Sequence, residues 1–128
     1  MIALDRAWAI ASLHPDADRG LAFLMNWPAP REAAGMILAR HGALKGGSED
    51  IPLWAGRLAG RYPVAAMLLL RVRIRTLVQL GADQEAAALT AEAAALAEQV
   101  EAPQGAPGHE AFVAELEAGK RKARWRRW

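Results

Sequence analysis

Residues 63–80 read PVAAMLLLRVRIRTLVQL, and this stretch decides the fold. Its first half is apolar on every side, which is typical of a helix surrounded by other helices. Pro63 suits the first turn of a helix, where the missing N–H of proline has no partner to lose. Arg71, Arg73 and Arg75 interrupt the run, whereas a membrane-spanning helix needs roughly 20 mostly apolar residues. We therefore predict a buried central helix.

The rest of the chain is also patterned for helices. Apolar residues recur every three or four positions, and we find no alternating run that predicts a strand. Gly42 and Gly81 stand where helices should end in the left-handed conformation, and Gly119 should end the last helix. Asp50 and Asp83 are placed to cap two helix starts. The predicted helices cover 2–13, 16–27, 30–41, 51–60, 63–80, 84–101 and a segment from 109.

The fold class predicted from these elements is all-α. About seven helices in antiparallel hairpins can form either a tetratricopeptide- or HEAT-like superhelix or an irregular bundle. A search for an internal repeat finds no convincing self-match. We expect a single helical domain over residues 1–119, with a polar linker at 45–50, and a separate basic tail at 120–128.

Charge divides the chain in the same way. Residues 1–119 hold all 14 acidic residues and 10 of the Lys and Arg residues, whereas the tail holds six basic residues and accounts for the net charge of +2.

Asp5 and Arg6 interrupt the first apolar stretch, so the start does not read as a signal peptide, and we expect a cytoplasmic protein.

The sequence offers no pattern that predicts catalysis. There is no cysteine, which excludes disulfides, thiolate metal sites and a Cys nucleophile. His14, His41 and His109 fall near predicted helix ends without the spacing that places two metal ligands on one helix face. The Gly46–Gly47 pair lacks the rest of a phosphate-binding loop. We therefore expect a non-enzymatic protein with no metal, no cofactor and no small-molecule substrate.

Two groups of residues are candidates for binding. Arg71 and Arg75 lie one turn apart, and they either pair with acids such as Glu85 or Glu92 on the next helix or line a groove for an anion or acidic peptide. The tail combines cations with indoles, which suits nucleic acid or an anionic surface, or else it packs on the acidic body of its own chain. The tail candidates are Lys120, Arg121, Lys122, Arg124, Trp125, Arg126, Arg127 and Trp128.

The function predicted from strong helical patterning without a catalytic motif is a scaffold or protein–protein interaction module. Its partner would be another protein or a second copy of the chain. Gly56 and Gly60 have the spacing of a closely packed helix pair, which more often marks an internal contact than a dimer face. The alternative function is binding of nucleic acid or an anionic surface through the tail.

Several stretches resemble the C-terminal part of an uncharacterised bacterial all-helical, helical-repeat-like family of unknown function. The resemblance rests on 58–71 (LAGRYPVAAMLLLR), 109–116 (HEAFVAEL), 3–9 (ALDRAWA) and 21–24 (LAFL), with His14-Pro15, Trp27, Arg121, Lys122 and Trp128. It implies an all-helical fold and supplies no activity, substrate or cofactor. The residues depart from the family pattern at Arg75, where an acid is expected, and at 83–97, which is richer in Ala and Glu. The resemblance also implies that N-terminal helices are missing, which would leave an apolar face for self-association.

Overall fold

The computed structural model describes residues 13–100 and 108–126, the last five of these by their backbone alone. Within those ranges every regular element is helical, which confirms the all-α prediction. The predicted helix over 2–13 lies outside the described residues except for Leu13. The described α-helices are α2 (Ala17–Asn26), α3 (Pro30–Arg40), α4 (Ile51–Ala59), α5 (Pro63–Gln79), α6 (Asp83–Gln99) and α7 (His109–Arg126), with a short 3-10 helix, η1 (His41–Ala43).

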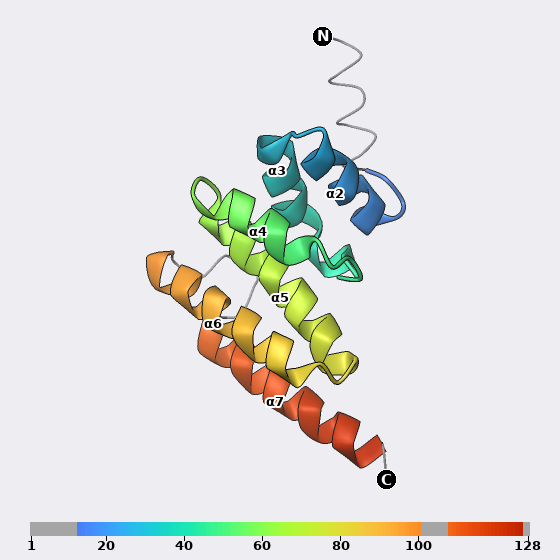
Figure 1. Cartoon of the computed structure of the whole chain (residues 1–128), viewed down its shortest axis with the longest axis vertical. Coiled ribbons are helices and arrows are strands. Elements are labelled where there is room, and N and C mark those ends of the chain that lie inside the picture. The colour runs from blue at the N-terminus through green and yellow to red at the C-terminus, as the bar shows by residue number, and fades with distance from the viewer. Residues whose placement is uncertain (1–12, 101–107, 127–128) are drawn as a thin grey trace.

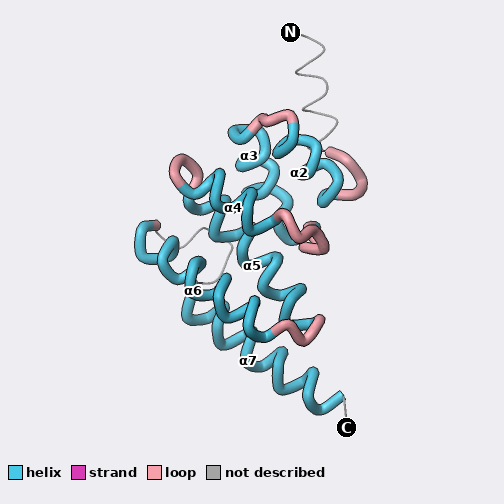
Figure 2. Tube along the Cα trace, viewed as in Figure 1, coloured by secondary structure: helices cyan, strands magenta, loops and turns pink. Residues whose placement is uncertain are grey.

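Helix α5 lies at the centre of this arrangement. Helices α4 and α6 pack on it as antiparallel neighbours, and α3 and α7 contact it as well, whereas α2 packs chiefly on α3 (Figure 1). Short loops join the helices from α2 to α6 (Figure 2). The α2–α3 hairpin therefore forms one end of the molecule, and α6 and α7 form the other side. The finer prediction of a repeat superhelix stays a prediction.

The burial of α5 confirms that it is the central helix. Every residue from Ala65 to Ile74 is buried, including Arg71 and Arg73. Leu69 and Ile74 are fully enclosed, and they belong to the same core cluster as equally buried residues of neighbouring helices, such as Leu58 of α4. Because each fully buried Leu or Ile side chain contributes about 1.5–3 kcal/mol, the apolar start of α5 supplies much of the free energy that holds the helices together.

Several predicted helix ends differ from the structure. Gly81 has a φ of 77° and ends α5 as predicted, but Gly42 is not left-handed and lies within η1; Gly46 has the positive φ, 73°, instead. Asp50 occupies the position before α4 without a capping hydrogen bond from its side chain. Asp83 is the first residue of α6 rather than its cap. An acid in the first turn still interacts favourably with the helix dipole, which explains its presence there.

Two predictions about glycines are wrong. Helix α7 continues through Gly119 to Arg126, because one glycine costs only about 1 kcal/mol relative to Ala and the residues around it are strong helix formers. Gly56 and Gly60 are not at a close contact, since a Cβ added at either position would meet nothing within 4 Å. Both glycines are exposed on the outer side of α4.

None of the helices in the described ranges is both long enough and apolar enough to cross a bilayer.

Candidate functional site

Two arginines of α5 enclose a buried ring of α7. Phe112 is 0% exposed, and the guanidinium carbons of Arg71 and Arg75 each lie 5.0 Å from the centre of its ring. Nη2 of Arg75 lies 3.7 Å from Oε2 of Glu115, one turn further along α7. Cations over an aromatic face are attracted by its quadrupole, more strongly where water is excluded. This cluster of Arg71, Arg75, Phe112 and Glu115 therefore fastens α7 to α5.

The two arginines of the cluster differ in their access to solvent. Arg71 is 2% exposed, and its Nη2 lies 4.0 Å from Sδ of Met67. Burial lowers the pKa of Arg71 below its ordinary value, the positive charge of Arg75 acts in the same direction, and the negative charge of Glu115 opposes them. Arg75 is 37% exposed. Arg71 is almost fully enclosed but also lines a hollow of about 420 Å³ together with His109, so both interpretations of the pair stay predictions.

The acid that pairs with Arg75 differs from the predicted ones. The expected partners were Glu85 and Glu92 of α6, but both are exposed and the ion pair is made with Glu115 of α7. The reason lies in the packing, since α7 buries Phe112 against the arginines of α5 and carries Glu115 one turn further along. An acid of α6 was expected because α6 follows α5 directly in the sequence. The acid that forms the ion pair belongs to α7, more than 30 residues away along the chain.

A second polar cluster holds the linker between α2 and α5. The carboxylate of Asp18 accepts two backbone hydrogen bonds, from the N–H of Lys45 at 2.7 Å and from that of Gly46 at 2.9 Å. From the opposite side, Nη1 of Arg73 donates to the carbonyl oxygen of Gly46 at 2.9 Å, and the hydroxyl of Thr76 donates to that of Lys45. We call Asp18, Lys45, Gly46, Arg73 and Thr76 the linker clamp.

The linker clamp was not foreseen from the sequence. From the sequence, Gly46 and Gly47 were assigned to a polar linker without a phosphate-binding motif, and Arg73 only to an interruption of the apolar run. A signal was present in the buried arginine of an apolar helix, because a charge that leaves water needs hydrogen-bond partners. The sequence does not say which carbonyl supplies them.

Concave regions of the surface border both clusters. One of about 530 Å³ is lined by Arg73, Leu77, Leu80, Glu49 and Glu85 among others. Another of about 440 Å³ is lined by His41, Lys45, Arg75, Thr76 and Gln79 among others. Over the described part of the chain, no three His, Asp or Glu side chains lie together as a metal site would require. His14 has a local role, since its Nδ1 accepts the backbone N–H of Asp16 at 2.9 Å.

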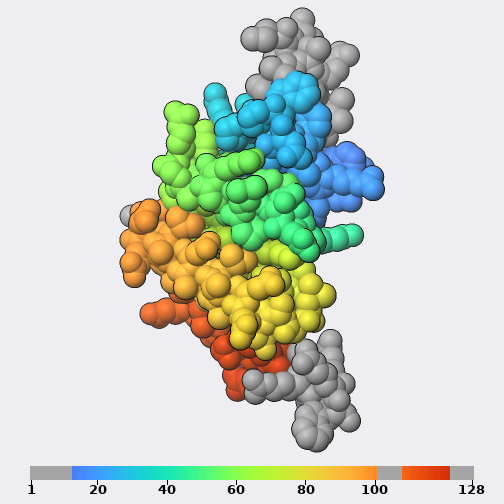
Figure 3. Space-filling model, viewed as in Figure 1, coloured from blue at the N-terminus to red at the C-terminus, as the bar shows by residue number. Residues whose placement is uncertain are grey.

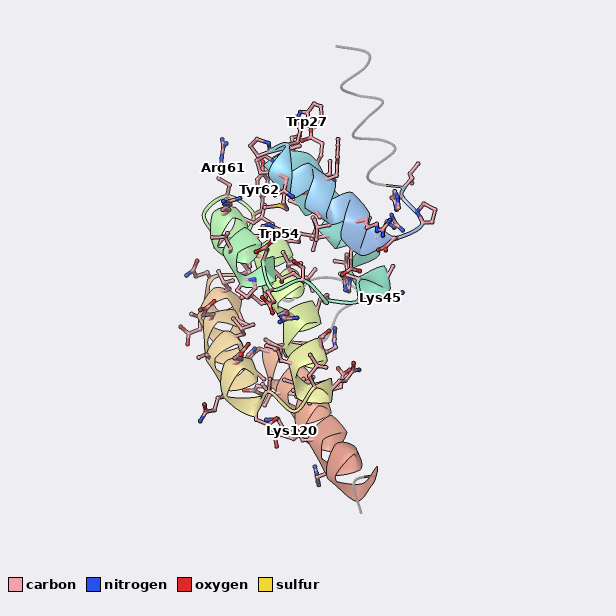
Figure 4. All side chains as sticks on the ribbon, turned by 45° about the vertical axis from the view of Figure 1, so that its right-hand side comes forward. Trp27, Lys45, Trp54, Arg61, Tyr62 and Lys120 are labelled. Carbon is pink, nitrogen blue, oxygen red and sulfur yellow. The ribbon has the colours of Figure 1, made fainter. Side chains whose placement is uncertain are left out.

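Large apolar side chains remain exposed at the α2–α3 hairpin. Phe23 and Trp27 are 39% and 49% exposed, and their ring centres lie 5.1 Å apart. Trp27 lies at the outer end of the hairpin, far from Lys120 on α7 (Figure 4). Leu13 and Leu38 are exposed as well. The sequence predicted a helix through Trp27 but not the exposure of this residue; its position just before Pro28 at the end of that helix was the available signal.

Helix α6 carries exposed acidic residues on more than one side, since at 3.6 residues per turn Glu98 lies about 120° around the axis from Glu92. Asp83, Glu85, Glu92 and Glu98 are all exposed, and none forms a salt bridge with another described residue. Between residues 76 and 119 the sequence contains eight acidic residues and no Lys or Arg. The outer side of α6 lies open to solvent (Figure 3).

The predicted basic tail begins as a continuation of α7. Lys120 makes a 3.3 Å contact from Nζ to Oε1 of Glu117 within the same helix. Arg121 is exposed. The backbone of Lys122, Arg124, Trp125 and Arg126 is helical. Their side chains, and Arg127 and Trp128, lie outside what the structure describes, so the two interpretations of the tail indoles both stay predictions.

Comparison with known proteins identifies the family. A family model described as "Family of unknown function (DUF6880)" matches residues 1–127, and the chain belongs to this family. This confirms the resemblance to an uncharacterised family. No curated protein and no solved structure matches the chain significantly.

Proposed function

We propose that this member of the family is a non-enzymatic helical module that binds another protein through its α2–α3 hairpin. The observation that supports the proposal is the distribution of exposed apolar side chains. Of the six large ones in the described residues, four belong to or adjoin the hairpin: Leu13, Phe23, Trp27 and Leu38. Exposed aromatic groups of this kind are typical anchors of protein interfaces.

The packing of α2 supports the same choice. Its inner side, with Leu21 and Leu24, is buried on α3, whereas its outer side carries Phe23 and Trp27. A partner that covers these rings would remove apolar surface from water at about 25 cal/mol per Å². Truncation of an anchor in such an interface commonly costs about 2 kcal/mol or more, which is about a 30-fold loss of affinity.

The experiment that tests this function compares three forms of the protein as bait in a native lysate, with quantitative identification of what is retained. The double variant Phe23→Ser/Trp27→Ser removes both rings. Leu80→Ser is the matched control, because Leu80 is 70% exposed but lies at the end of α5. We expect a defined protein to be retained by the wild type and by Leu80→Ser and lost with the double variant.

Two results would contradict the proposal. One is that the double variant retains the same proteins as the wild type while its helical signal and melting temperature are normal. The other is that Leu80→Ser loses them equally, since binding would then depend on general surface hydrophobicity rather than on the hairpin.

A further inference from the structure

A hollow beside α5 brings together cationic and hydrogen-bonding side chains from three segments of the chain. It has a volume of about 440 Å³ and is lined by His41 of η1, Lys45 of the linker, and Arg75, Thr76 and Gln79 of α5. Among the described residues that line it there is no Asp or Glu. Hollows of about 300–1,000 Å³ with a few convergent polar groups are typical of sites for small ligands.

The side chains that α5 contributes follow from its helical period. Val72, Arg75, Thr76 and Gln79 stand at positions i, i+3, i+4 and i+7, which places them on one side of the helix. Because Arg75 and Gln79 are one turn apart, their Cβ atoms are about 5–6 Å from each other. A guanidinium and a side-chain amide at this spacing can donate hydrogen bonds to the same ligand.

The linker clamp fixes Lys45 at this hollow. The backbone N–H of Lys45 donates to the carboxylate of Asp18 at 2.7 Å, and its carbonyl oxygen accepts a hydrogen bond from the hydroxyl of Thr76. Both hydrogen bonds use backbone atoms of Lys45, and its ammonium group forms no salt bridge with another described residue. The clamp therefore holds a cation at the same hollow as Arg75 without neutralising its charge.

The charges at the hollow favour an anion. Nη2 of Arg75 lies 3.7 Å from Oε2 of Glu115, which is longer than a charge-assisted hydrogen bond of about 2.7–2.9 Å, so the guanidinium keeps donors for a ligand. The acids that contact the two cationic residues, Asp18 and Glu115, do not line the hollow. Two cations at one site repel each other, and an anion bound between them would relieve that repulsion.

We propose that this hollow binds a small organic phosphate, with Lys45, Arg75 and Gln79 donating to the phosphate oxygens. A phosphate monoester carries up to two negative charges and three terminal oxygens, which suits two cations and a neutral donor better than the single charge of a carboxylate does. A water molecule takes about 30 Å³, so a phosphate group of five heavy atoms fills only part of the hollow. The apolar side chains in its lining, Leu44 and Val72, are then available to contact the organic part of the ligand.

Titration of the full chain with phenyl phosphate, followed through its amide signals by NMR, is the first test. We expect saturable shifts at the amides of residues 41–45 and 72–79, with a dissociation constant in the millimolar range or below, and no shifts with phenol, which lacks the charge. Inorganic phosphate should bind more weakly, because it lacks the ring. No saturable shifts up to about 20 mM, shifts confined to residues 120–128, or equal affinity for inorganic phosphate would overturn the proposal.

Gln79→Glu is the second test, because it places a carboxylate in the hollow with almost no change of shape. The affinity for phenyl phosphate should fall at least about tenfold, since a like charge then faces the phosphate. Gln84→Glu is the matched control: it makes the same change at an exposed residue of α6 that does not line the hollow, and it should bind like the wild type. Equal losses in both variants would show that net charge decides binding, which contradicts the site.

Removal of the two cations is the third test. Lys45→Gln/Arg75→Gln should lower the affinity at least about tenfold, because a hydrogen bond to a charged group contributes more than a neutral one. Arg57→Gln/Arg61→Gln changes the net charge equally at two exposed residues outside the hollow, and it should have little effect. Figure 4 shows Arg61 and Lys45 on opposite sides of the molecule. Normal binding by a Lys45→Gln/Arg75→Gln protein that melts like the wild type would refute the proposal.

Competition separates a small ligand from a polymer. If a single-stranded oligonucleotide displaces phenyl phosphate from the amides of the hollow and binds far more tightly, the hollow is part of a nucleic-acid surface and the small-ligand proposal is wrong. The hollow lies beyond the end of α3, whereas Trp27 precedes the start of that helix. Phe23→Ser/Trp27→Ser should therefore leave phosphate binding unchanged, so this proposal and the proposed function can fail independently.

Discussion

Replacement of Gly46 by Ala should disrupt the linker clamp without removing a core side chain. Gly46 has a φ of 73°, a region that costs a residue with a Cβ roughly 1–2 kcal/mol. The new Cβ would lie 2.7 Å from Oγ1 of Thr76, 2.8 Å from the carbonyl oxygen of Val72 and 2.9 Å from its Cγ1. Since α5 is packed on all sides, neither its backbone nor the linker can move aside without losing hydrogen bonds.

The expected loss of stability follows from these contacts. Relief of the overlap costs about 1–3 kcal/mol in a well-packed site, and loss of a clamp hydrogen bond adds about 1 kcal/mol. Together with the backbone term, the free energy of unfolding should fall by about 3–6 kcal/mol. In a chain of 128 residues, 1 kcal/mol corresponds to about 4 °C in melting temperature, so we expect a decrease of at least 10 °C or so.

Gly47→Ala is the matched control for this prediction. It makes the same chemical change one residue away, where φ is not positive and an added Cβ would meet nothing within 4 Å. Its stability should change by less than about 1 kcal/mol. Thermal unfolding followed by circular dichroism, with urea titrations at fixed temperature, measures both variants. If the two melt within about 2 °C of each other, the close approach of Gly46 to α5 does not hold the linker, and the reasoning is refuted.

Three further changes test the two clusters, each by urea unfolding. Phe112→Ala should lower the free energy of unfolding by about 3–5 kcal/mol, because it leaves a cavity between α5 and α7; a loss below about 1 kcal/mol would show that the ring is not buried there. Asp18→Ala should cost about 1–3 kcal/mol and accelerate hydrogen exchange at the amides of Lys45 and Gly46, whereas unchanged exchange would contradict the clamp. Arg75→Gln should cost less than about 1 kcal/mol for its half-exposed ion pair with Glu115, and a larger loss that persists in high salt would indicate that the guanidinium acts mainly through Phe112.

The sequence was sufficient for the described helices, α2 to α7, and their order, because hydrophobic period and proline position are local signals. The apolar start of α5 identified the central helix, and Pro30 and Pro63 marked the first residues of their helices. The linker at 45–50 was also predicted correctly as non-helical. These features depend on residues close together in the chain.

The contacts that hold the helices together could not be predicted in the same way. Gly42 and Gly46 carry similar local signals, and only the approach of Val72 and Thr76 requires a glycine at the second. The choice of Glu115 rather than Glu85 as the partner of Arg75 depends on how α7 packs on α5. Gly119 was assigned as a helix end because a glycine is a weak helix former, yet its neighbours outweigh that preference.

The same difference between local signals and tertiary contacts applies to the candidate site residues. Their charges and aromatic groups are visible in the sequence, but their exposure is not. Arg71 and Arg75 differ strongly in exposure although they were predicted as an equivalent pair. Phe23 and Trp27 were assigned to a helix, and it is the limited packing of α2 that leaves them exposed.

The linker clamp also determines where the chain can be divided into fragments. A segment containing Gly-Gly-Ser would ordinarily be chosen as the hinge for cutting the chain into independent fragments, or as the place to insert a tag. Here that segment is held in place, since Asp18 and Arg73 form hydrogen bonds with Gly46 from opposite sides. Separation at residues 45–50 would expose a buried guanidinium on one fragment and leave an unused carboxylate on the other. The two parts on either side of the linker should therefore be expressed and studied as one unit.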